Sequence, residues 1–262
     1  MNADTVRAWI EYLENWRPTR LPDDPGEFVR AVMGREFTEF HRRWWDFTAT
    51  HAQSLILAPR GHGKSTILTV AYTLKRLLER PDTRALIASN TAAQAEGFLR
   101  EVRAHLERNP LVVRACGPLA GSPWNERELC LASRLLSAKE PSLTALGVLG
   151  PVISRHYDLI ILDDVVDEEA ARSSLGRRRL RTWYFKELLP TLEPEGELHL
   201  VGTRYHRDDL YGALIAAGMP ALVEPGIRGE AGAEAALWEE KFPLALLRRR
   251  REEAGPAIFN SQ

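Results

Sequence analysis

The stretch SLILAPRGHGKST (residues 54–66) decides the fold of this chain. It opens on a short run of apolar residues, SLILA (54–58), which is typical of a strand buried on both faces of a parallel sheet. Residues 58–65 read APRGHGKS and meet every position of the phosphate-loop pattern GxxxxGK(S/T) except the first glycine. A helix is predicted to follow, from Ile67 to about Glu79. Because strand, loop and helix come in the required order, we interpret the stretch as a phosphate-binding loop rather than an incidental turn.

The residues of this loop predict how a phosphate would be held. Successive backbone N–H groups of such a loop point toward phosphate oxygens, and the positive end of the following helix adds to the attraction. Lys64 is expected to reach the terminal phosphates, and the Ser65 hydroxyl to ligate Mg²⁺. Lysine is rare in this chain, at five residues against 30 arginines, so a lysine at this position favours a functional role over a chance match. The candidate phosphate contacts are Pro59, Arg60, Gly61, His62, Gly63, Lys64, Ser65 and Thr66.

Two later strands are predicted to end in polar residues. The run YDLIIL (157–162) leads into Asp163, expected to hold Mg²⁺ through water, and Asp164, expected to orient and polarise an attacking water. The run ELHLVG (197–202) leads into Thr203, which is placed to contact that water or the γ-phosphate. Taken alone, each set is also what an ordinary strand-ending turn or a capping threonine would show. Because the carboxyl ends of parallel strands lie at one edge of a sheet, we expect Asp163, Asp164 and Thr203 to lie beside the phosphate loop.

Strands alternate with helices along most of the chain. This alternation predicts an α/β fold with a mainly parallel sheet flanked by helices. The domain organisation that we expect is an N-terminal helical segment (1–50), a core (51–219) and a less regular C-terminal extension (220–262). The other predicted elements are strands at 84–89 and 129–132 and helices at 25–50, 92–108 and 172–189.

The charge balance excludes one class of nucleic-acid binder. With 35 basic against 36 acidic residues, the chain cannot bind through bulk positive charge, so any contact with DNA must be local. The densest basic runs are Arg177–Arg181 and Arg248–Arg251, and each is also consistent with a solvated helix face whose arginines pair with nearby acids. The start of the chain does not have the pattern of a signal peptide, and no apolar stretch approaches the length of a membrane span. We therefore expect a soluble, intracellular protein.

Together these segments resemble the ATPase domain of the large terminase subunit of tailed bacteriophages, the motor that packages DNA into a procapsid. The resemblance rests on the loop at 58–66, the run at 140–173, the segment VGTRYHRDDLYG (201–212) and the tail at 242–262. It covers most of the chain from about Phe40 onward. It implies an additional-strand, RecA-like P-loop NTPase fold.

The resemblance also implies roles for individual residues. Many members of the family use glutamate as the acid that activates water, whereas this chain has Asp164, one methylene shorter. Glu168 and Glu169 are the alternatives if the following loop folds back. The resemblance assigns Lys64 and Ser65 as the phosphate-loop pair and Asp163 as the carboxylate that binds magnesium. It places Thr203 in the motif that couples hydrolysis to movement.

Two further roles follow from the resemblance. The family binds adenine with a segment just before the first strand, which is FHRRWWDF (40–47) here, so His41 is expected to hydrogen-bond the base; alternatively, the tryptophans of this segment are simply core. Motors of this class also need an arginine that stabilises the transition state. Arg155, in the loop before the acid-bearing strand, is the candidate for action on a neighbouring subunit, and Arg60 the candidate for action within its own subunit.

The function implied by the resemblance is ATP hydrolysis with Mg²⁺ that drives double-stranded DNA into the procapsid. The implied partners are DNA, the portal protein, the terminase small subunit and further copies of the chain in a ring, in the host bacterial cytoplasm without a membrane. The tail GPAIFNSQ (255–262) resembles the family's connection to a C-terminal nuclease domain, so no nuclease is expected in this chain. The alternatives are a helicase-like ATPase and an assembly module regulated by nucleotide.

Overall fold

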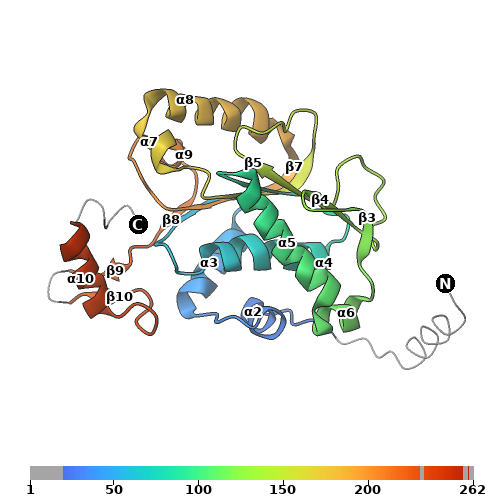
Figure 1. Ribbon diagram of the computed structural model, residues 1–262, viewed down its shortest axis with the longest axis horizontal. Coiled ribbons are helices and arrows are strands. Elements are labelled where there is room, and N and C mark those ends of the chain that lie inside the picture. Colours follow the sequence, from blue (N-terminus) through green and yellow to red (C-terminus); the bar gives the residue numbers. More distant parts are fainter. Residues whose placement is uncertain (1–19, 231–232, 256–258, 260–262) are drawn as a thin grey trace, which may run out of the picture.

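An eight-stranded sheet runs through the computed structural model, which describes residues 20–230, 233–255 and 259 (Figure 1). Its strand order is β3-β4-β5-β2-β6-β7-β1-β8. The strands from β5 to β8 in this order run parallel, while β3 and β4 pair antiparallel at one edge. The prediction of a mainly parallel α/β sheet is therefore confirmed. The strands are β1 Gln53–Leu57, β2 Ala85–Ser89, β3 Ala120–Trp124, β4 Glu128–Leu131, β5 Leu143–Gly147, β6 Tyr157–Asp163, β7 Leu192–Gly202 and β8 Ala221–Val223.

Helices cover both faces of the sheet (Figure 1). On one face, the first hydrophobic cluster packs the sheet against α2 Pro25–Met33, α3 Glu39–Thr50, the π-helix η1 Ser65–Ala71, α4 Tyr72–Glu79, α5 Ala92–Arg108 and α6 Pro110–Cys116. On the other face, a second cluster packs it against α7 Glu168–Arg172, α8 Ser174–Thr182, the π-helix η2 Trp183–Leu188, the short 3₁₀ turn η3 Leu189–Thr191 and α9 Leu210–Ala216. The sheet is thus buried on both faces, which explains the continuous apolar runs of its central strands.

The N-terminal helical stretch predicted at 25–50 is two helices rather than one. Gly34 takes the left-handed conformation (φ 61°) and its N–H donates to the Arg30 carbonyl, which ends α2. Thr38 then starts α3 in a capping box with His41. The prediction of a continuous helix was therefore wrong at this glycine. The part of the predicted segment before residue 20 lies outside the described residues.

The strands predicted at 84–89, 129–132, 157–162 and 197–202 are present as β2, β4, β6 and β7. Three strands of this sheet were not predicted from the sequence. Two are β3, at the edge beside β4, and β5, which lies between β4 and β2. The third is β8, whose pairing with β1 brings the first residues of the range 220–262 into the sheet.

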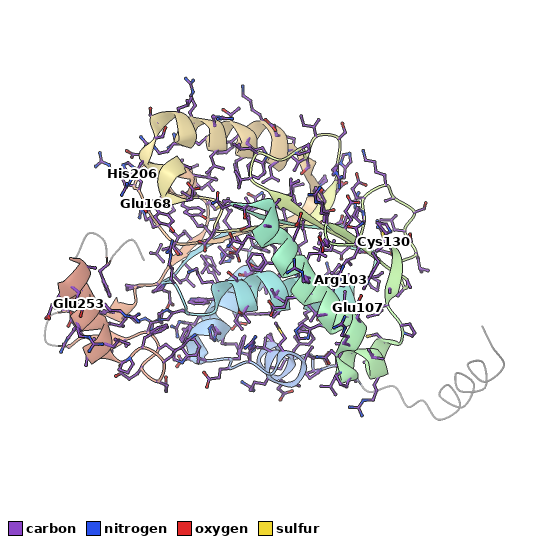
Figure 2. All side chains as sticks on the ribbon, in the orientation of Figure 1. Arg103, Glu107, Cys130, Glu168, His206 and Glu253 are labelled. Atoms are coloured by element: carbon purple, nitrogen blue, oxygen red, sulfur yellow. The ribbon has the colours of Figure 1, made fainter. Side chains whose placement is uncertain are left out.

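The remaining C-terminal elements lie beyond β8, at the left of Figure 1: the paired strands β9 Ile227–Arg228 and β10 Ala235–Ala236, and helix α10 Leu244–Ala254. Figure 2 shows Glu253 of α10 at this end of the molecule and Cys130 of β4 toward the other. Among the described residues, none of the helices combines the length and apolarity that crossing a membrane would require.

Candidate functional site

The loop between β1 and η1 depends on two glycines. Gly61 and Gly63 have φ of 76° and 82°, a conformation that residues with a side chain rarely adopt. A Cβ on Gly61 would lie 2.9 Å from the Phe242 ring, and one on Gly63 would lie 3.1 Å from His41 Nε2. Both the backbone conformation and the close neighbours therefore require glycine, as in the concave backbone nests that bind anions.

Lys64 lies inside the loop rather than in solvent. Its side chain is buried, and its ammonium donates to the carbonyl oxygens of Ala58 (2.7 Å) and Pro59 (3.0 Å) and to Thr203 Oγ1 (3.3 Å). Burial lowers the pKa of Lys64, while the nearby charges of Asp164 and Asp163 oppose that shift. Lys64 of the phosphate loop thus contacts Thr203, the residue that follows β7.

Asp163 is the last residue of β6, at the carboxyl end of the strand, and lies beside the phosphate loop. Ser65 Oγ donates to one carboxylate oxygen at 3.0 Å, and Thr69 Oγ1 donates to the other. Burial raises the pKa of Asp163 to about 6 despite the opposing hydrogen bonds from Thr69 and Ser65; the neighbouring charge of Asp164 also raises it. The two residues predicted to bind Mg²⁺ are therefore in direct contact.

This donor set fits Mg²⁺ because a carboxylate and hydroxyl groups are hard oxygen ligands. Among the described residues there is no group of three or more histidines, cysteines, aspartates and glutamates arranged to hold a metal ion. A magnesium ion at Ser65 and Asp163 would therefore take its other ligands from phosphate oxygens and water, as Mg²⁺ usually does in nucleotide sites.

Asp164 occupies a tight turn beside Thr203. It has φ of 46°, its N–H donates to the Val201 carbonyl at 2.8 Å, and its Oδ1 accepts from the Thr203 N–H at 3.1 Å. The carboxylate is thus held between the ends of β6 and β7. Of the two alternative acids, Glu168 is exposed on α7 and pairs with Arg172, while the side chain of Glu169 lies outside the described part of the structure.

Lys64, Ser65 and Asp164 line a pocket of about 580 Å³. Several of its residues were not singled out in the sequence. Asn90 directly follows β2, a position that the strand-end argument would have found. Lys241 comes from the C-terminal part of the chain, and only the scarcity of lysine pointed to it. The residues lining the pocket are Arg60, Gly61, Gly63, Lys64, Ser65, Thr66, Asn90, Gln94, Asp164, Val166, Asp167, Tyr205 and Lys241.

The aromatic segment before β1 supports the loop from inside the protein. His41 is buried, with Nε2 2.8 Å from the His62 carbonyl and Nδ1 accepting from the Thr38 N–H at 3.1 Å. Burial lowers the pKa of His41 to about 4. Trp44 and Trp45 are also buried in the core. Both ring nitrogens of His41 are therefore engaged within the chain, and a hydrogen bond to adenine would require one of them to be released.

The two candidate arginines lie in different places. Arg60 contacts the Tyr205 hydroxyl, and its guanidinium carbon is 5.5 Å from the centre of the Tyr205 ring, at the pocket. Arg155 precedes the first residue of β6, at the opposite end of this strand from Asp163, and pairs with Glu128 at 2.9 Å. The length of β6 therefore separates Arg155 from the phosphate loop of its own chain.

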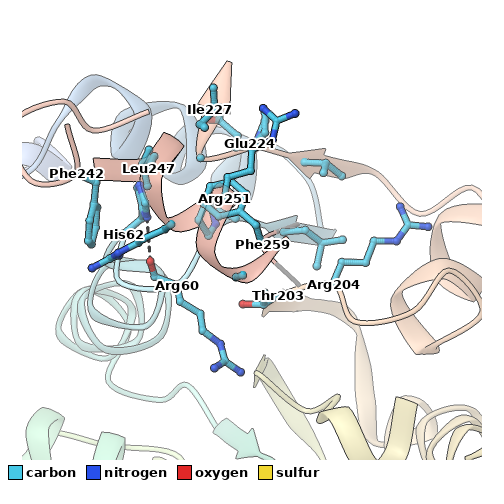
Figure 3. Close-up of a pocket in the computed structure, with 18 of the residues that line it drawn as sticks. Arg60, His62, Thr203, Arg204, Glu224, Ile227, Phe242, Leu247, Arg251 and Phe259 are labelled. Atoms are coloured by element: carbon cyan, nitrogen blue, oxygen red, sulfur yellow. Dashed lines mark hydrogen bonds between the residues drawn. The ribbon is translucent and has the colours of Figure 1, made fainter. Parts of the chain in front are cut away.

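A second pocket, of about 880 Å³, lies on the other side of the loop, against the C-terminal elements (Figure 3). Pro59, Arg60, His62 and Thr203 line it from the loop and the end of β7. The C-terminal elements contribute apolar and basic side chains, among them Phe242, Leu247, Arg251 and Phe259. Because Arg60 lines both pockets, they meet at the phosphate loop.

The parallel sheet, the loop after β1 and the acids after β6 define a P-loop NTPase fold. Solved structures of the same fold include the large terminase ATPase domain of Thermus phage P74-26, with a TM-score of 0.59, 15% identity and coverage of 93% of this chain and 97% of that one. A mutant of that domain, in which one arginine is replaced by alanine, matches with a TM-score of 0.58, 15% identity and the same coverage. The large terminase of a thermophilic bacteriophage matches with a TM-score of 0.50 and 11% identity, over 86% of this chain and 52% of that one.

No family model and no curated protein matches the chain. At these identities the structural likeness establishes the fold, and the fold implied by the sequence resemblance is confirmed.

Proposed function

We propose that this chain hydrolyses ATP with Mg²⁺ and is the ATPase domain of a motor that packages viral DNA. One observation carries the proposal: Lys64, Ser65, Asp163, Asp164 and Thr203, from three separate segments, converge beside one loop. The shared fold of the P74-26 large terminase ATPase domain supports the packaging role.

Each residue has a defined task in this proposal. The loop N–H groups hold the phosphates, and Lys64 exchanges its two carbonyl partners for phosphate oxygens. Ser65 and Asp163 hold Mg²⁺, which would neutralise charge that develops on the phosphates. Asp164 orients the attacking water and accepts its proton, and the Thr203 N–H keeps that carboxylate in place.

The two basic runs differ in how their charge is compensated. On α10, Arg248 and Arg251 pair with Glu234, so this run matches the expectation of a solvated face paired with acids. On α8, Arg177 and Arg181 donate to backbone carbonyls, and the described residues show no ion pair for any arginine of this helix. We therefore propose α8 as the surface that contacts the DNA backbone.

The proposal is tested by measuring nucleotide binding and ATP turnover together. Lys64→Ala is expected to weaken binding of the fluorescent nucleotide mant-ATP, and Asp164→Asn to lower turnover by about 100-fold or more while binding is retained. Duplex DNA is expected to stimulate the wild-type turnover, whereas Arg178→Gln/Arg179→Gln on α8 reduces that stimulation. Normal turnover in both pocket variants would overturn the site assignment, and turnover indifferent to DNA would favour a nucleotide-regulated assembly module.

A further inference from the structure

Residues 237–242, which we call the loop-contact segment, pack directly on the phosphate loop. The Phe242 ring stacks on His62, with ring centres 4.7 Å apart and an interplanar angle of 27° (Figure 3). Trp238 packs near the same histidine, at 6.2 Å between ring centres. Lys241 donates from Nζ to the Gly61 carbonyl at 2.7 Å. A stretch about 180 residues downstream of the loop thus contacts the loop backbone itself.

The ammonium of Lys241 lies at the rim of the pocket that contains Lys64. It is 4.6 Å from the centre of the Trp238 ring and 5.4 Å from that of Phe242, and it lines the 580 Å³ pocket. Its side chain is exposed, and the part of the chain that the structure describes shows no ion pair for it. Arg60, by contrast, is engaged by Tyr205.

The positive charge of Lys241 is not neutralised by any acid among the described residues, and it lies at the pocket that is proposed to bind phosphates. A lysine side chain is long and flexible, so the ammonium can leave a single carbonyl oxygen while its stem stays against the two rings. A hydrogen bond between an ammonium and a phosphate oxygen is stronger than one between an ammonium and a neutral carbonyl. Phosphates in the pocket would therefore compete successfully with Gly61 for this ammonium.

We propose that Lys241 is a second lysine ligand of the nucleotide phosphates, supplied by the loop-contact segment of the same chain. The inference rests on the proposed nucleotide binding and names one more residue of that site. On binding, Lys241 leaves the Gly61 carbonyl and donates to a phosphate oxygen. The contact between the C-terminal elements and the phosphate loop therefore differs between the free and the nucleotide-bound protein.

A purely structural tie is the competing explanation, because the bond from Lys241 to Gly61 also holds the loop. The two roles differ in their dependence on ionic strength. A cation that pairs with phosphate makes binding weaken with added salt, since salt screens that attraction. A tie to a carbonyl stabilises the loop but contributes no phosphate attraction that salt would screen.

The test is the dissociation constant of mant-ATP at about 50 and about 300 mM KCl for the full chain, a range over which screening changes strongly. Lys241→Met should weaken binding about fivefold at the lower salt concentration and flatten the salt dependence, because one of the attracting cations is gone. Lys241→Arg should retain most of the affinity and the salt dependence. Lys186→Met, which removes an exposed lysine from η2, is the matched control and should behave as wild type.

The inference would be overturned by a Lys241→Met variant with wild-type affinity. It would also be overturned if that variant bound more weakly at both salt concentrations with an unchanged salt dependence, since this is the result for a structural tie. Failure of the wild-type chain to bind mant-ATP would instead contradict the proposed function.

Discussion

At the scale of single residues, the surroundings of Asp163 explain how a buried carboxylate is kept ready for a cation. Burial raises its pKa to about 6, and the hydroxyl groups of Thr69 and Ser65 oppose this shift by donating to the ionised form. Ser65 belongs to the phosphate-loop pattern. Thr69 does not, and its contact shows that the residues after the pattern also shape the site.

Thr69→Val should raise the pKa of Asp163 further, because the substitution removes a hydrogen bond that favours the charged carboxylate. At pH 7 more of this residue would be protonated, and we expect the apparent Mg²⁺ affinity in ATP turnover to fall about fivefold. The deficit should shrink at about pH 8.5, where the carboxylate ionises again. Thr73→Val is the matched control, because the buried Thr73 hydroxyl has no hydrogen-bond partner among the described residues. An unchanged Mg²⁺ dependence in Thr69→Val would contradict this role of the hydroxyl.

Site residues could be predicted where they belong to a contiguous sequence pattern. Lys64, Ser65, Asp163 and Asp164 lie in short contiguous patterns, so the sequence was enough to propose them. Lys241 and Thr69 were missed because their positions depend on tertiary packing and on a π-helical turn that no local pattern reveals.

At the scale of secondary-structure elements, the phosphate-loop helix is fixed to the sheet by a cluster around Glu197 of β7. Tyr72 and Arg76 of α4 donate to its carboxylate at 2.6 and 2.5 Å. Burial alone would raise the pKa of Glu197, but hydrogen bonds from His199, Tyr72 and Arg76 lower it to about 2. The helix behind the loop and the strand before Thr203 are therefore joined by a charged contact.

Glu197→Gln is expected to lower the free energy of unfolding at pH 7 by about 2 kcal/mol, because Arg76 loses its partner in a partly buried site. The folded-state pKa lies below the ordinary value of 4.5, so the charge contributes fully above pH 4.5 and is lost as the pH falls toward 2. Urea unfolding at about pH 7, 5 and 3 should therefore show the gap between variant and wild type closing. Glu195→Gln, at an exposed position of the same strand, should leave stability unchanged. A gap independent of pH would argue against this role of the charge.

The elements themselves were predictable where the apolar pattern was continuous. The runs of β1, β2 and β6 are buried on both faces and were found from sequence. β5 (LTALG) contains a threonine and ends in glycine, and β8 has three residues, so neither forms a continuous apolar run that would indicate a strand. Their places in the sheet depend on pairing with β2 and β1, which is a tertiary property.

At the scale of the whole molecule, the net charge of −1 conceals an uneven distribution. Three of the four arginines of α10 are paired with acids, while those of α8 are not paired in the described part of the chain. Arg155, the candidate for action on a neighbouring subunit, lies at the far end of β6 from the phosphate loop. One chain therefore presents its pocket, its basic helix and its candidate trans-acting arginine at different places.

If Arg155 acts on a neighbouring subunit, mixing Arg155→Ala chains with Lys64→Ala chains should restore part of the ATP turnover that each variant lacks alone, because the intact pocket of an Arg155→Ala chain can then receive the arginine of a Lys64→Ala neighbour. The measurement is turnover against mixing ratio at constant total protein. Glu128→Gln is the matched control, because it breaks the ion pair but keeps the arginine. No recovery of turnover at any mixing ratio would show that Arg155 does not act on a neighbour.

The pocket between the ends of β1, β6 and β7 is proposed to hydrolyse ATP with Asp164 as the base. The most direct test of this claim is single-turnover hydrolysis of ATP with Mg²⁺ by Asp164→Asn and by Glu168→Gln, at nucleotide concentrations that saturate both variants. We predict that Asp164→Asn binds ATP but hydrolyses it at least about 100-fold more slowly, while Glu168→Gln hydrolyses it at the wild-type rate. Hydrolysis by Asp164→Asn at the wild-type rate would contradict the claim.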